Sequence, residues 1–180
     1  MGGARAMPAV AFRAATPADA PALAALLAGL SPDSAYLRFQ TAIGPAPSPA
    51  LVRGLLPDGV RGTALLGFCG DDLVAHGLWV RLGPTRTAEI ALVVADEHQR
   101  GGLGSALASA LLDDLAAHGI ERVEVYAGAG NRAVARMMAR AAPDAHRERD
   151  GATVSYSFGT SHRRGQPTTR SSGPRHPTAA

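Results

Sequence analysis

The chain contains one segment whose residue types and spacing suit phosphate binding, Gln99-Arg100-Gly101-Gly102-Leu103-Gly104-Ser105. A run of branched apolar residues precedes it and predicts a buried strand over 88–95. The alanine- and leucine-rich sequence that follows predicts a helix over 103–118. A strand, a glycine-rich turn and a helix direct unpaired backbone N–H groups at a bound anion, and glycines let the backbone approach phosphate oxygens closely. This segment is therefore a candidate phosphate-binding turn.

The spacing of the glycines separates three classes of nucleotide site. A P-loop requires a lysine after its last glycine, and this chain has no lysine, since all 18 of its basic residues are arginine. A dinucleotide-binding turn requires a third glycine where Leu107 stands, and an acidic residue at a strand end about 20 residues later, which is missing. The third pattern, Gln/Arg-x-x-Gly-x-Gly/Ala, is met by Gln99, Gly102 and Gly104.

This third pattern resembles motif A of the GNAT superfamily of N-acetyltransferases, which holds the pyrophosphate of acetyl-CoA. The resemblance extends over residues 8–159 and includes a first strand near Val10, a helix start with Thr16 as N-cap and Asp19 three residues later, and a strand near Arg122. It implies an α/β fold in which a mixed, mostly antiparallel central sheet is flanked by helices. Two neighbouring strands of that sheet splay apart in a V that accommodates acetyl-CoA, and no metal ion is implied.

The resemblance implies which residues hold the cofactor. Backbone N–H groups of the turn, with the helix dipole, would bind the pyrophosphate, and main-chain groups of the preceding strand would polarise the acetyl carbonyl. The family usually has Gln-Gly-Arg-Gly-x-Gly, so arginine and glycine are exchanged here at 100 and 101. Asn131 would contact the pantetheine arm, or would simply cap a helix. The implied cofactor-binding residues are Leu92, Val93, Val94, Gln99, Arg100, Gly101, Gly102, Leu103, Gly104, Ser105 and Asn131.

Glu89 is the candidate general base, because it is the only acidic residue in the predicted strand and precedes its apolar run. Strand alternation places Glu89 on the face opposite Ile90, and a partly buried carboxylate has the raised pKa that suits a base. The alternative is an exposed glutamate at a strand start. Asp96 and Glu97 are interpreted as a solvated loop. Where many family members have a tyrosine acid the chain has Met138, so Tyr126 or a water would have to substitute.

A second segment, Leu30-Ser31-Pro32-Asp33-Ser34-Ala35-Tyr36-Leu37-Arg38-Phe39, is similar to one in bacterial protein-lysine acetyltransferases that have acetyl-CoA synthetase among their substrates. In that subgroup the segment walls the acceptor side. The chain has Ala142-Pro143 where a Gly-Phe is usual. The resemblance implies an acetyl-CoA-dependent N-acetyltransferase that modifies a primary amine, with a protein lysine as the favoured acceptor. Alternatives are a small-molecule amine acetyltransferase and a non-catalytic CoA-binding regulatory module.

Composition predicts one domain over 8–159 and a disordered basic tail over 160–180. The chain has 180 residues, 46% of them hydrophobic, which is enough for a single core. The tail has four arginines and no acidic residue, and nucleic-acid binding through it is the last-ranked alternative. Cys69 is the single cysteine and the histidines lack metal-ligand spacing, so we expect a cytoplasmic protein without a metal site. We expect a monomer or homodimer and no membrane segment.

Coarse periodicity predicts the remaining elements. Strands are expected at 9–14, 63–69, 73–82, 121–127 and 152–159, with a hairpin at Gly70-Asp71-Asp72. Helices are expected at 17–29, from Ser31 through Phe39, from a Ser48 cap to Leu56, and at 131–142.

Overall fold

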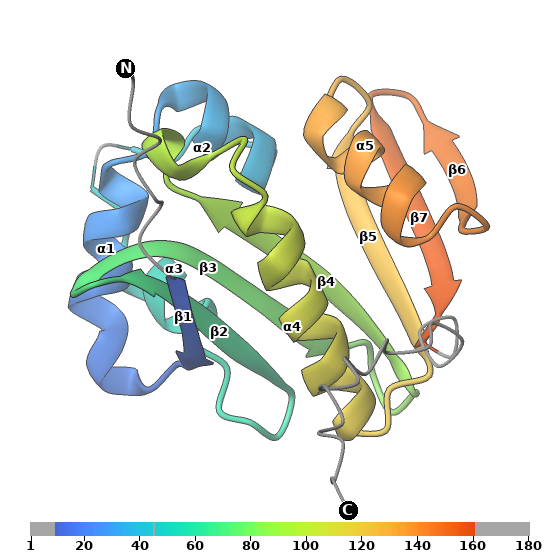
Figure 1. The fold of residues 1–180 in the computed structure, drawn as a ribbon, viewed down its shortest axis with the longest axis horizontal. Coiled ribbons are helices and arrows are strands. Elements are labelled where there is room, and N and C mark those ends of the chain that lie inside the picture. The colour runs from blue at the N-terminus through green and yellow to red at the C-terminus, as the bar shows by residue number, and fades with distance from the viewer. Residues whose placement is uncertain (1–9, 45, 161–180) are drawn as a thin grey trace, which may run out of the picture.

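A computed structural model describes residues 10–44 and 46–160, which form a single seven-stranded sheet covered by helices on both faces (Figure 1). The strands lie in the order β1-β2-β3-β4-β5-β7-β6. They are β1 (Val10–Ala14), β2 (Gly62–Cys69), β3 (Asp72–Arg81), β4 (Thr87–Val94), β5 (Arg122–Gly128), β6 (His146–Asp150) and β7 (Thr153–Gly159). The helices are α1 (Ala20–Ala28), α2 (Pro32–Phe39), α3 (Pro49–Gly54), α4 (Leu103–Ala117) and α5 (Arg132–Ala141), with 3-10 turns η1 (Pro17–Asp19) and η2 (Asp96–His98). The expected tail lies outside the described residues apart from Thr160.

The sheet is antiparallel except at its centre, where β4 and β5 run parallel. Their pairing extends only from Thr87 to Glu89 on β4, whereas β4 stays paired with β3 as far as Val94. Beyond Glu89 the two central strands diverge, and Figure 1 shows them side by side at one end and apart at the other. This is the V-shaped splay that the family resemblance implies, so the fold prediction is confirmed.

Separate hydrophobic clusters cover the two faces of the sheet. One cluster joins α4 to the sheet through Leu107, Leu111 and Trp79, and the other joins α1 and α3 through Leu23 and Val52. Figure 1 shows α4 and α5 on the viewer's side of the sheet and α3 behind it. The indole N–H of Trp79 donates a 2.7 Å hydrogen bond to Asp114 of α4, so this buried aromatic side chain has its polar atom satisfied.

Gly77 of β3 allows α4 to approach the sheet closely. A Cβ on this residue would lie 2.5 Å from Cδ1 of Leu111 and 3.2 Å from Cδ2 of Leu107, and both leucines are fully buried. The glycine is therefore required by packing, and it fixes the distance of α4 from the strand beneath it.

Side chains cap the helices that lead to the site. The Ser31 hydroxyl accepts a hydrogen bond from Ser34 N and starts α2, and the Ser48 hydroxyl accepts one from Leu51 N and starts α3. Asp19 accepts a 2.7 Å hydrogen bond from Thr16 N, so the predicted capping residues do interact, although a 3-10 turn precedes α1.

Strand β6 was not predicted. Its five residues, His146 to Asp150, are all exposed and polar, so they lack the apolar alternation by which strands are detected. The strand forms by antiparallel pairing with β7 at the edge of the sheet. In the described part of the chain no helix is both long and apolar enough to cross a membrane.

Candidate active site

The glycine-rich turn forms the N-terminus of α4. Gly102 is the N-cap with φ 85°, a left-handed conformation that glycine adopts without strain, and the space where its Cβ would stand is open. The first backbone N–H groups of an α-helix have no partner within the helix, so those of Leu103, Gly104 and Ser105 point out of the helix end. The open space and these donors fit a diphosphate. The residues predicted to bind the pyrophosphate therefore meet at one place.

Arg100 also has a left-handed backbone, with φ 64°. This conformation is unfavourable for a residue with a Cβ, and it costs on the order of 1–2 kcal/mol. The exchange of arginine and glycine at 100 and 101 has thus put the arginine at a position where glycine would be unstrained. Strain of this kind at an exposed turn is typical of functional sites.

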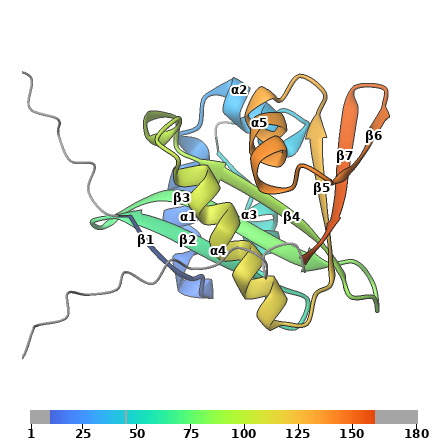
Figure 2. The same cartoon turned by 45° about the vertical axis from the view of Figure 1, so that its right-hand side comes forward.

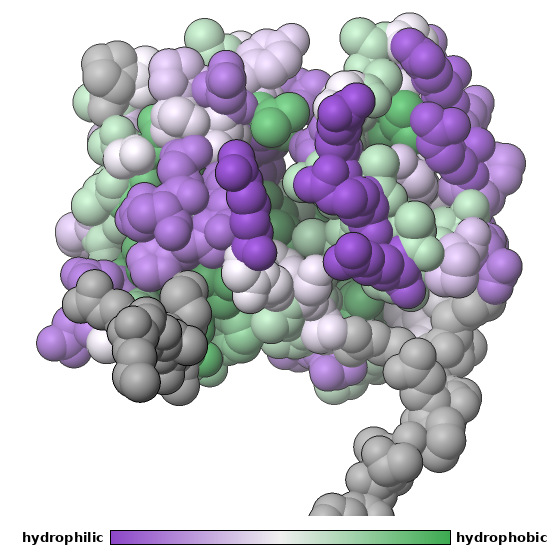
Figure 3. Space-filling view, turned by 45° about the horizontal axis from the view of Figure 1, so that its top comes forward, coloured by the Kyte–Doolittle hydropathy of each residue, from purple (hydrophilic) through white to green (hydrophobic). Residues whose placement is uncertain are grey.

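The floor of the gap between α4 and α5 is apolar. A Cβ on Gly104 would lie 3.5 Å from Cε of Met137 in α5, and 3.8 Å from both Cδ1 of Leu92 and Cγ2 of Val94 in β4. The start of α4, the free end of β4 and α5 therefore meet at Gly104. Figure 3 shows a recess on this side of the molecule with hydrophobic residues at its bottom and hydrophilic residues along its rims.

The predicted carbonyl-binding residues Leu92, Val93 and Val94 lie past the last pairing of β4 with β5. Their backbones pair with β3, and in a strand the main-chain groups alternate between the two sides. The groups that point away from β3 therefore face the gap. Val93 and Val94 are buried and Leu92 is half-buried, so core packing accounts for their side chains.

Asp96 and Gln99 join the turn to α2. Asp96 and Glu97 are exposed in the short turn η2, as expected for a solvated loop, and the Asp96 side chain also has partners that were not expected. Its carboxylate accepts hydrogen bonds from Ser31 N at 2.9 Å, from Ser31 Oγ at 2.9 Å and from Ser34 Oγ at 2.6 Å. Gln99 Nε2 donates to Ser34 Oγ and to Val94 O, each at 3.0 Å. The start of α2 is thereby docked on the end of β4. The Gln99 side chain is occupied in this contact, and its predicted role in cofactor binding stays a prediction.

Asn131 caps α5 at the mouth of the gap. Its Oδ1 accepts a 3.1 Å hydrogen bond from Val134 N, and the residue is buried. The capping interpretation is thus confirmed for the oxygen atom. The amide nitrogen is the atom that remains to contact a pantetheine arm, and that role stays a prediction.

Glu89 lies at the point where β4 and β5 begin to part, half-buried, on the face opposite α4. Burial raises the pKa of its carboxyl group, the neighbouring Glu124 carboxylate raises it further, and the positive charge of Arg38 lowers it. The net shift is upward, in the direction that makes a carboxylate a better proton acceptor. This environment favours the prediction of a general base over that of an exposed strand-start glutamate.

Sequence reasoning named Tyr126 but missed the other polar groups near Glu89. Glu124 is its register partner on β5, and the Tyr126 hydroxyl donates a short hydrogen bond to Glu124, which with burial raises the pKa of Tyr126 to about 12. From the helix side, Arg38 of α2 interacts electrostatically with both Glu89 and the fully buried His76 of β3. The alternation of polar residues along 122–128 was the signal that could have identified Glu124 on the same face as Tyr126.

His76 of β3, opposite Val93 of β4, is a neutral histidine. Burial lowers its pKa to about 4, and Nε2 lies 2.9 Å from Leu55 O, so Nε2 carries the proton. Its Nδ1 and the Nε of Arg38 are buried without a hydrogen-bond partner in the described part of the chain. Buried unsatisfied polar atoms are rare in folded proteins and are more often retained for function than for stability.

Met138 cannot act as an acid. It is buried in a cluster with Val154 and Tyr156, between α5 and the sheet. The absence of the family's tyrosine at this position therefore reflects core packing, and Tyr126 lies on the opposite face of β5 beside Glu124.

Two hollows border the sheet away from the gap. One of about 300 Å³ lies beside the turn, on the β1 side of α4, and is lined by Val10, Phe12, Cys69, His98, Gly101, Gly102, Leu103 and Ala106. Cys69 is half-buried, so it lines this hollow and also packs against the core cluster under α1.

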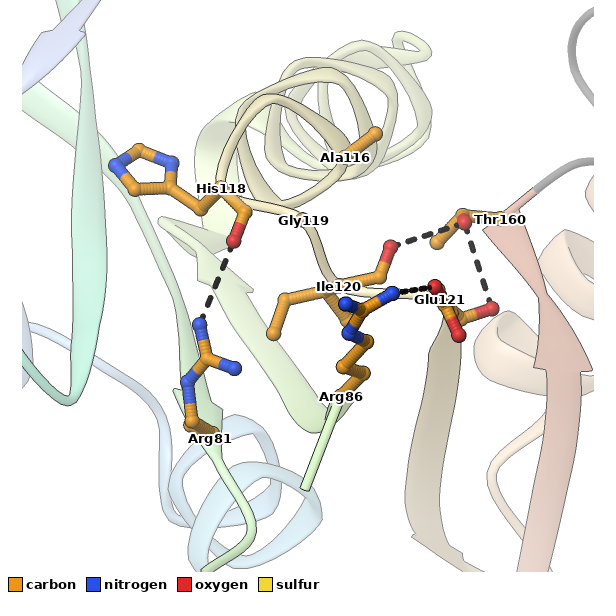
Figure 4. A pocket seen from close by; sticks show the side chains of 8 residues that line it. All are labelled: Arg81, Arg86, Ala116, His118, Gly119, Ile120, Glu121 and Thr160. Atoms are coloured by element: carbon orange, nitrogen blue, oxygen red, sulfur yellow. Dashed lines mark hydrogen bonds and ion pairs between the residues drawn. The ribbon is translucent and has the colours of Figure 1, made fainter. Parts of the chain in front are cut away.

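The other hollow, of about 780 Å³, lies at the opposite end of the sheet from the turn (Figure 4). Its charged side chains already have partners. Arg86 pairs with Glu121, and Arg81 donates to the carbonyl oxygens of Thr85 and His118. This hollow lies between the β3–β4 hairpin and the end of α4, and it is not part of the site around Glu89.

The fold, with its parted central strands and a helix start that leaves backbone N–H groups free, is the arrangement expected of an acyl-CoA-dependent transferase. The comparisons agree, since the model of the acetyltransferase (GNAT) family matches residues 32–142. The chain belongs to this family and is an N-acetyltransferase. No curated protein matches it.

The solved structures that are similar to the chain include three named acetyltransferases. The GNAT domain of S. lividans PAT is 25% identical, with a TM-score of 0.76, and the match covers 82% of this chain and 89% of that one. The spermidine N-acetyltransferase of Vibrio cholerae, in complex with CoA and spermine, is 14% identical with a TM-score of 0.66, covering 84% and 96%. The ribosomal-protein-S18-alanine N-acetyltransferase of Escherichia coli is 14% identical with a TM-score of 0.65, covering 84% and 94%. The last two similarities concern the fold alone.

Proposed function

We propose that residues 8–159 form a catalytic domain that transfers the acetyl group of acetyl-CoA to the side-chain amine of a protein lysine, with Glu89 as general base. The observation that carries this proposal is the position of Glu89. Its half-buried carboxyl group stands where β4 and β5 part, on the face away from the phosphate-binding turn. An amine entering from that face would meet the carboxylate before it reached a thioester held in the gap.

Each step of the reaction has a candidate group in the chain. The N–H groups at the start of α4 would hold the diphosphate, and the unpaired main chain of β4 would bind the acetyl carbonyl oxygen. Glu89 would take a proton from the ammonium, directly or through a water. The thiolate is a tolerable leaving group, and Tyr126, whose raised pKa keeps it protonated at neutral pH, or a water would return the proton.

Exposed hydrophobic residues beside Glu89 support a protein acceptor. In the described part of the chain the exposed large hydrophobic residues are Tyr36, Leu37, Val60 and Tyr126. All except Val60 belong to α2 and β5, and α2 packs against both β4 and β5. Figure 2 shows α2 at the end of the sheet where β4 and β5 part. Exposed aromatic and aliphatic side chains around a carboxylate suit a lysine presented on a protein surface, whose stem is apolar and whose head is charged.

The similarity to the GNAT domain of S. lividans PAT, a protein acetyltransferase that is 25% identical to this chain, supports a protein acceptor. We place the reaction in the cytoplasm, where acetyl-CoA and protein lysines are both present. A monomer or homodimer is sufficient, because every proposed catalytic group comes from one chain.

The test replaces Glu89 with glutamine and measures acetyl-CoA binding and turnover separately. Removal of a general base lowers kcat by about 10²–10⁴-fold, while the affinity for acetyl-CoA should not change. Glu148→Gln on the exposed edge strand β6 is the matched control and should retain full activity. A Glu89→Gln enzyme with normal turnover would refute the catalytic role. A wild-type protein that binds acetyl-CoA but shows no detectable turnover, and a Glu89→Gln variant that binds it equally well, would instead favour a CoA-binding regulatory module.

The acceptor is tested by comparing kcat/KM for lysine-containing proteins with that for polyamines and aminoglycosides. We expect a protein substrate to be preferred, and we expect Tyr36→Ala and Leu37→Ala to raise KM for the protein without affecting acetyl-CoA binding. A preference for a small amine that is insensitive to both substitutions would move the assignment to small-molecule acetylation.

A further inference from the structure

Helix α5 carries a row of arginines on its outer surface. Arg132, Arg136 and Arg140 are spaced four residues apart, so they lie along one side of the helix, and all three are exposed. The helix contains no acidic residue. The ion pairs found among residues 10–44 and 46–160 involve none of these arginines. Figure 3 shows strongly hydrophilic residues along one rim of the apolar recess.

The row borders the gap in which a cofactor would bind. Met137, which follows Arg136 and precedes Arg140 by one turn, is the α5 residue that approaches the start of α4 at Gly104. Met138, next along the helix, points in the other direction, into the cluster with Val154 and Tyr156. The side of α5 that carries Met137 therefore faces the phosphate-binding turn across the gap. Arg140 shares that side with Met137, and Arg136 adjoins it.

We propose that Arg136 and Arg140, assisted by Arg132, bind the 3′-phosphate of the adenosine part of CoA. This inference rests on the proposed use of acetyl-CoA. The turn at the start of α4 can satisfy the diphosphate with its few unpaired N–H groups, and the third phosphate, on the ribose, then needs a separate partner. Guanidinium groups match phosphate oxygens in charge and in bidentate geometry, and a row of them at helical spacing offers more than one.

The hollow on the other side of α4 is a poorer place for this phosphate. Among the described residues, its lining is apolar or glycine apart from Cys69 and His98 and includes no arginine. A doubly charged phosphate there would lose its hydration without gaining a permanently charged partner. The two sides of the turn thus differ in charge, and the side of α5 is the one that suits an anion.

The experiment compares the affinities of CoA and dephospho-CoA, which lacks only the 3′-phosphate, by titration calorimetry at fixed ionic strength. We expect the wild type to bind CoA about tenfold more tightly, as one charge-assisted contact in a partly exposed site would give. In the Arg136→Gln/Arg140→Gln double variant this ratio should fall toward one, through a loss of CoA affinity with dephospho-CoA affinity unchanged. Arg147→Gln, an exposed arginine on β6, is the matched control and should keep the wild-type ratio.

The outcomes separate this inference from the proposed function. Equal binding of the two ligands by the wild type, or a ratio that survives in the double variant, would overturn the phosphate site while leaving acetyl-CoA as the co-substrate. Failure of both ligands to bind the wild type would overturn both. The double variant replaces exposed side chains only, and an unchanged thermal unfolding midpoint will establish that α5 is intact.

Discussion

The two faces of β4 carry different kinds of side chain. On the α4 face, Ile90, Leu92 and Val94 pack against the helix, and the chemistry there is left to backbone groups. On the opposite face, Glu89 and the buried His76 each interact electrostatically with Arg38, so ionisable side chains occupy what would otherwise be core positions. Because strand side chains alternate, one strand can hold a cofactor on one face and act on its acceptor from the other.

The face of the sheet opposite α4, on which α2 packs, contains the less favourable interactions; we call it the α2 face. The α4 face is apolar and its Trp79 has a hydrogen-bond partner, whereas on the other face two buried polar atoms, on His76 and Arg38, have no partner among the described residues. The α4 face should therefore respond to changes in volume and backbone, and the α2 face to changes in charge. Substitutions on the two faces can test this difference.

Gly102→Glu should have the largest effect. It places a carboxylate in front of the N–H groups at the start of α4, which both occupies them and repels a diphosphate, so CoA affinity should fall about 100-fold or more. Calorimetry measures the loss. Gly59→Glu is a matched control, because Gly59 also has a left-handed backbone, φ 86°, and open space around it, but lies far from the turn. A similar loss of affinity in the control would mean that backbone strain, and not the turn, is responsible.

Gly77→Ala tests the packing of the α4 face. An alanine in a strand is intrinsically favoured over glycine by about 0.5–1 kcal/mol, but the new Cβ would lie 2.5 Å from a methyl group of the fully buried Leu111. Overpacking should win and lower the free energy of unfolding by about 1–3 kcal/mol, as measured by urea denaturation. Gly54→Ala, where a Cβ meets no atom within 4 Å, should not destabilise the protein. A stabilised Gly77→Ala variant would show that α4 is loosely packed.

Arg38→Met tests the charges on the α2 face. Arg38 lowers the pKa of Glu89 against burial and the Glu124 carboxylate, so its removal should raise that pKa further. The base acts when deprotonated, and the acid limb of the kcat/KM profile should therefore move to higher pH. The other ionisable groups nearby are Tyr126, which stays protonated, and His76, which stays neutral.

Two variants accompany this pH profile. Arg38→Lys keeps the charge and should restore the acid limb toward its wild-type position, which a purely structural role would not predict. Arg53→Met, on the exposed side of α3, should leave the profile unchanged. An acid limb that moves to lower pH in Arg38→Met would refute the electrostatic coupling.

Arg100→Gly should have the smallest effect, with opposite signs for stability and for CoA affinity. Glycine relieves the left-handed backbone at φ 64°, so the free energy of unfolding should rise by about 1 kcal/mol. If the guanidinium contacts the diphosphate, CoA affinity should fall in the same variant. Thermal unfolding and calorimetry on one sample measure both, and a gain in stability without any loss of affinity would mean that the side chain has no role in binding.

The sequence was sufficient for the parts of the molecule that have local signals. The turn at 99–105, the helix after it and the position of Glu89 on its strand follow from composition and alternation, and the structure brings them together as expected. The docking of Asp96 on Ser31 joins residues 65 positions apart and has no local signal. The same is true of Arg38, whose neighbours Glu89 and His76 are defined only by how α2 packs on the sheet. Strand β6 forms because its backbone pairs with the free edge of β7, and the residues of β6 do not themselves indicate a strand.

The short parallel ladder between Thr87 and Glu89 is what joins the β1–β4 portion of the sheet to the β5–β7 portion. We call these two portions the leaves of the sheet; α4 packs on the first and α5 on the second. A ligand that contacts both leaves should slow hydrogen exchange most in the backbone amides of Ile90 to Val94 and of Val125 to Gly128. Saturation at 100 times Kd would add about 2.7 kcal/mol to the stability of the folded protein. The cofactor would then determine how tightly the two leaves of the enzyme are held together.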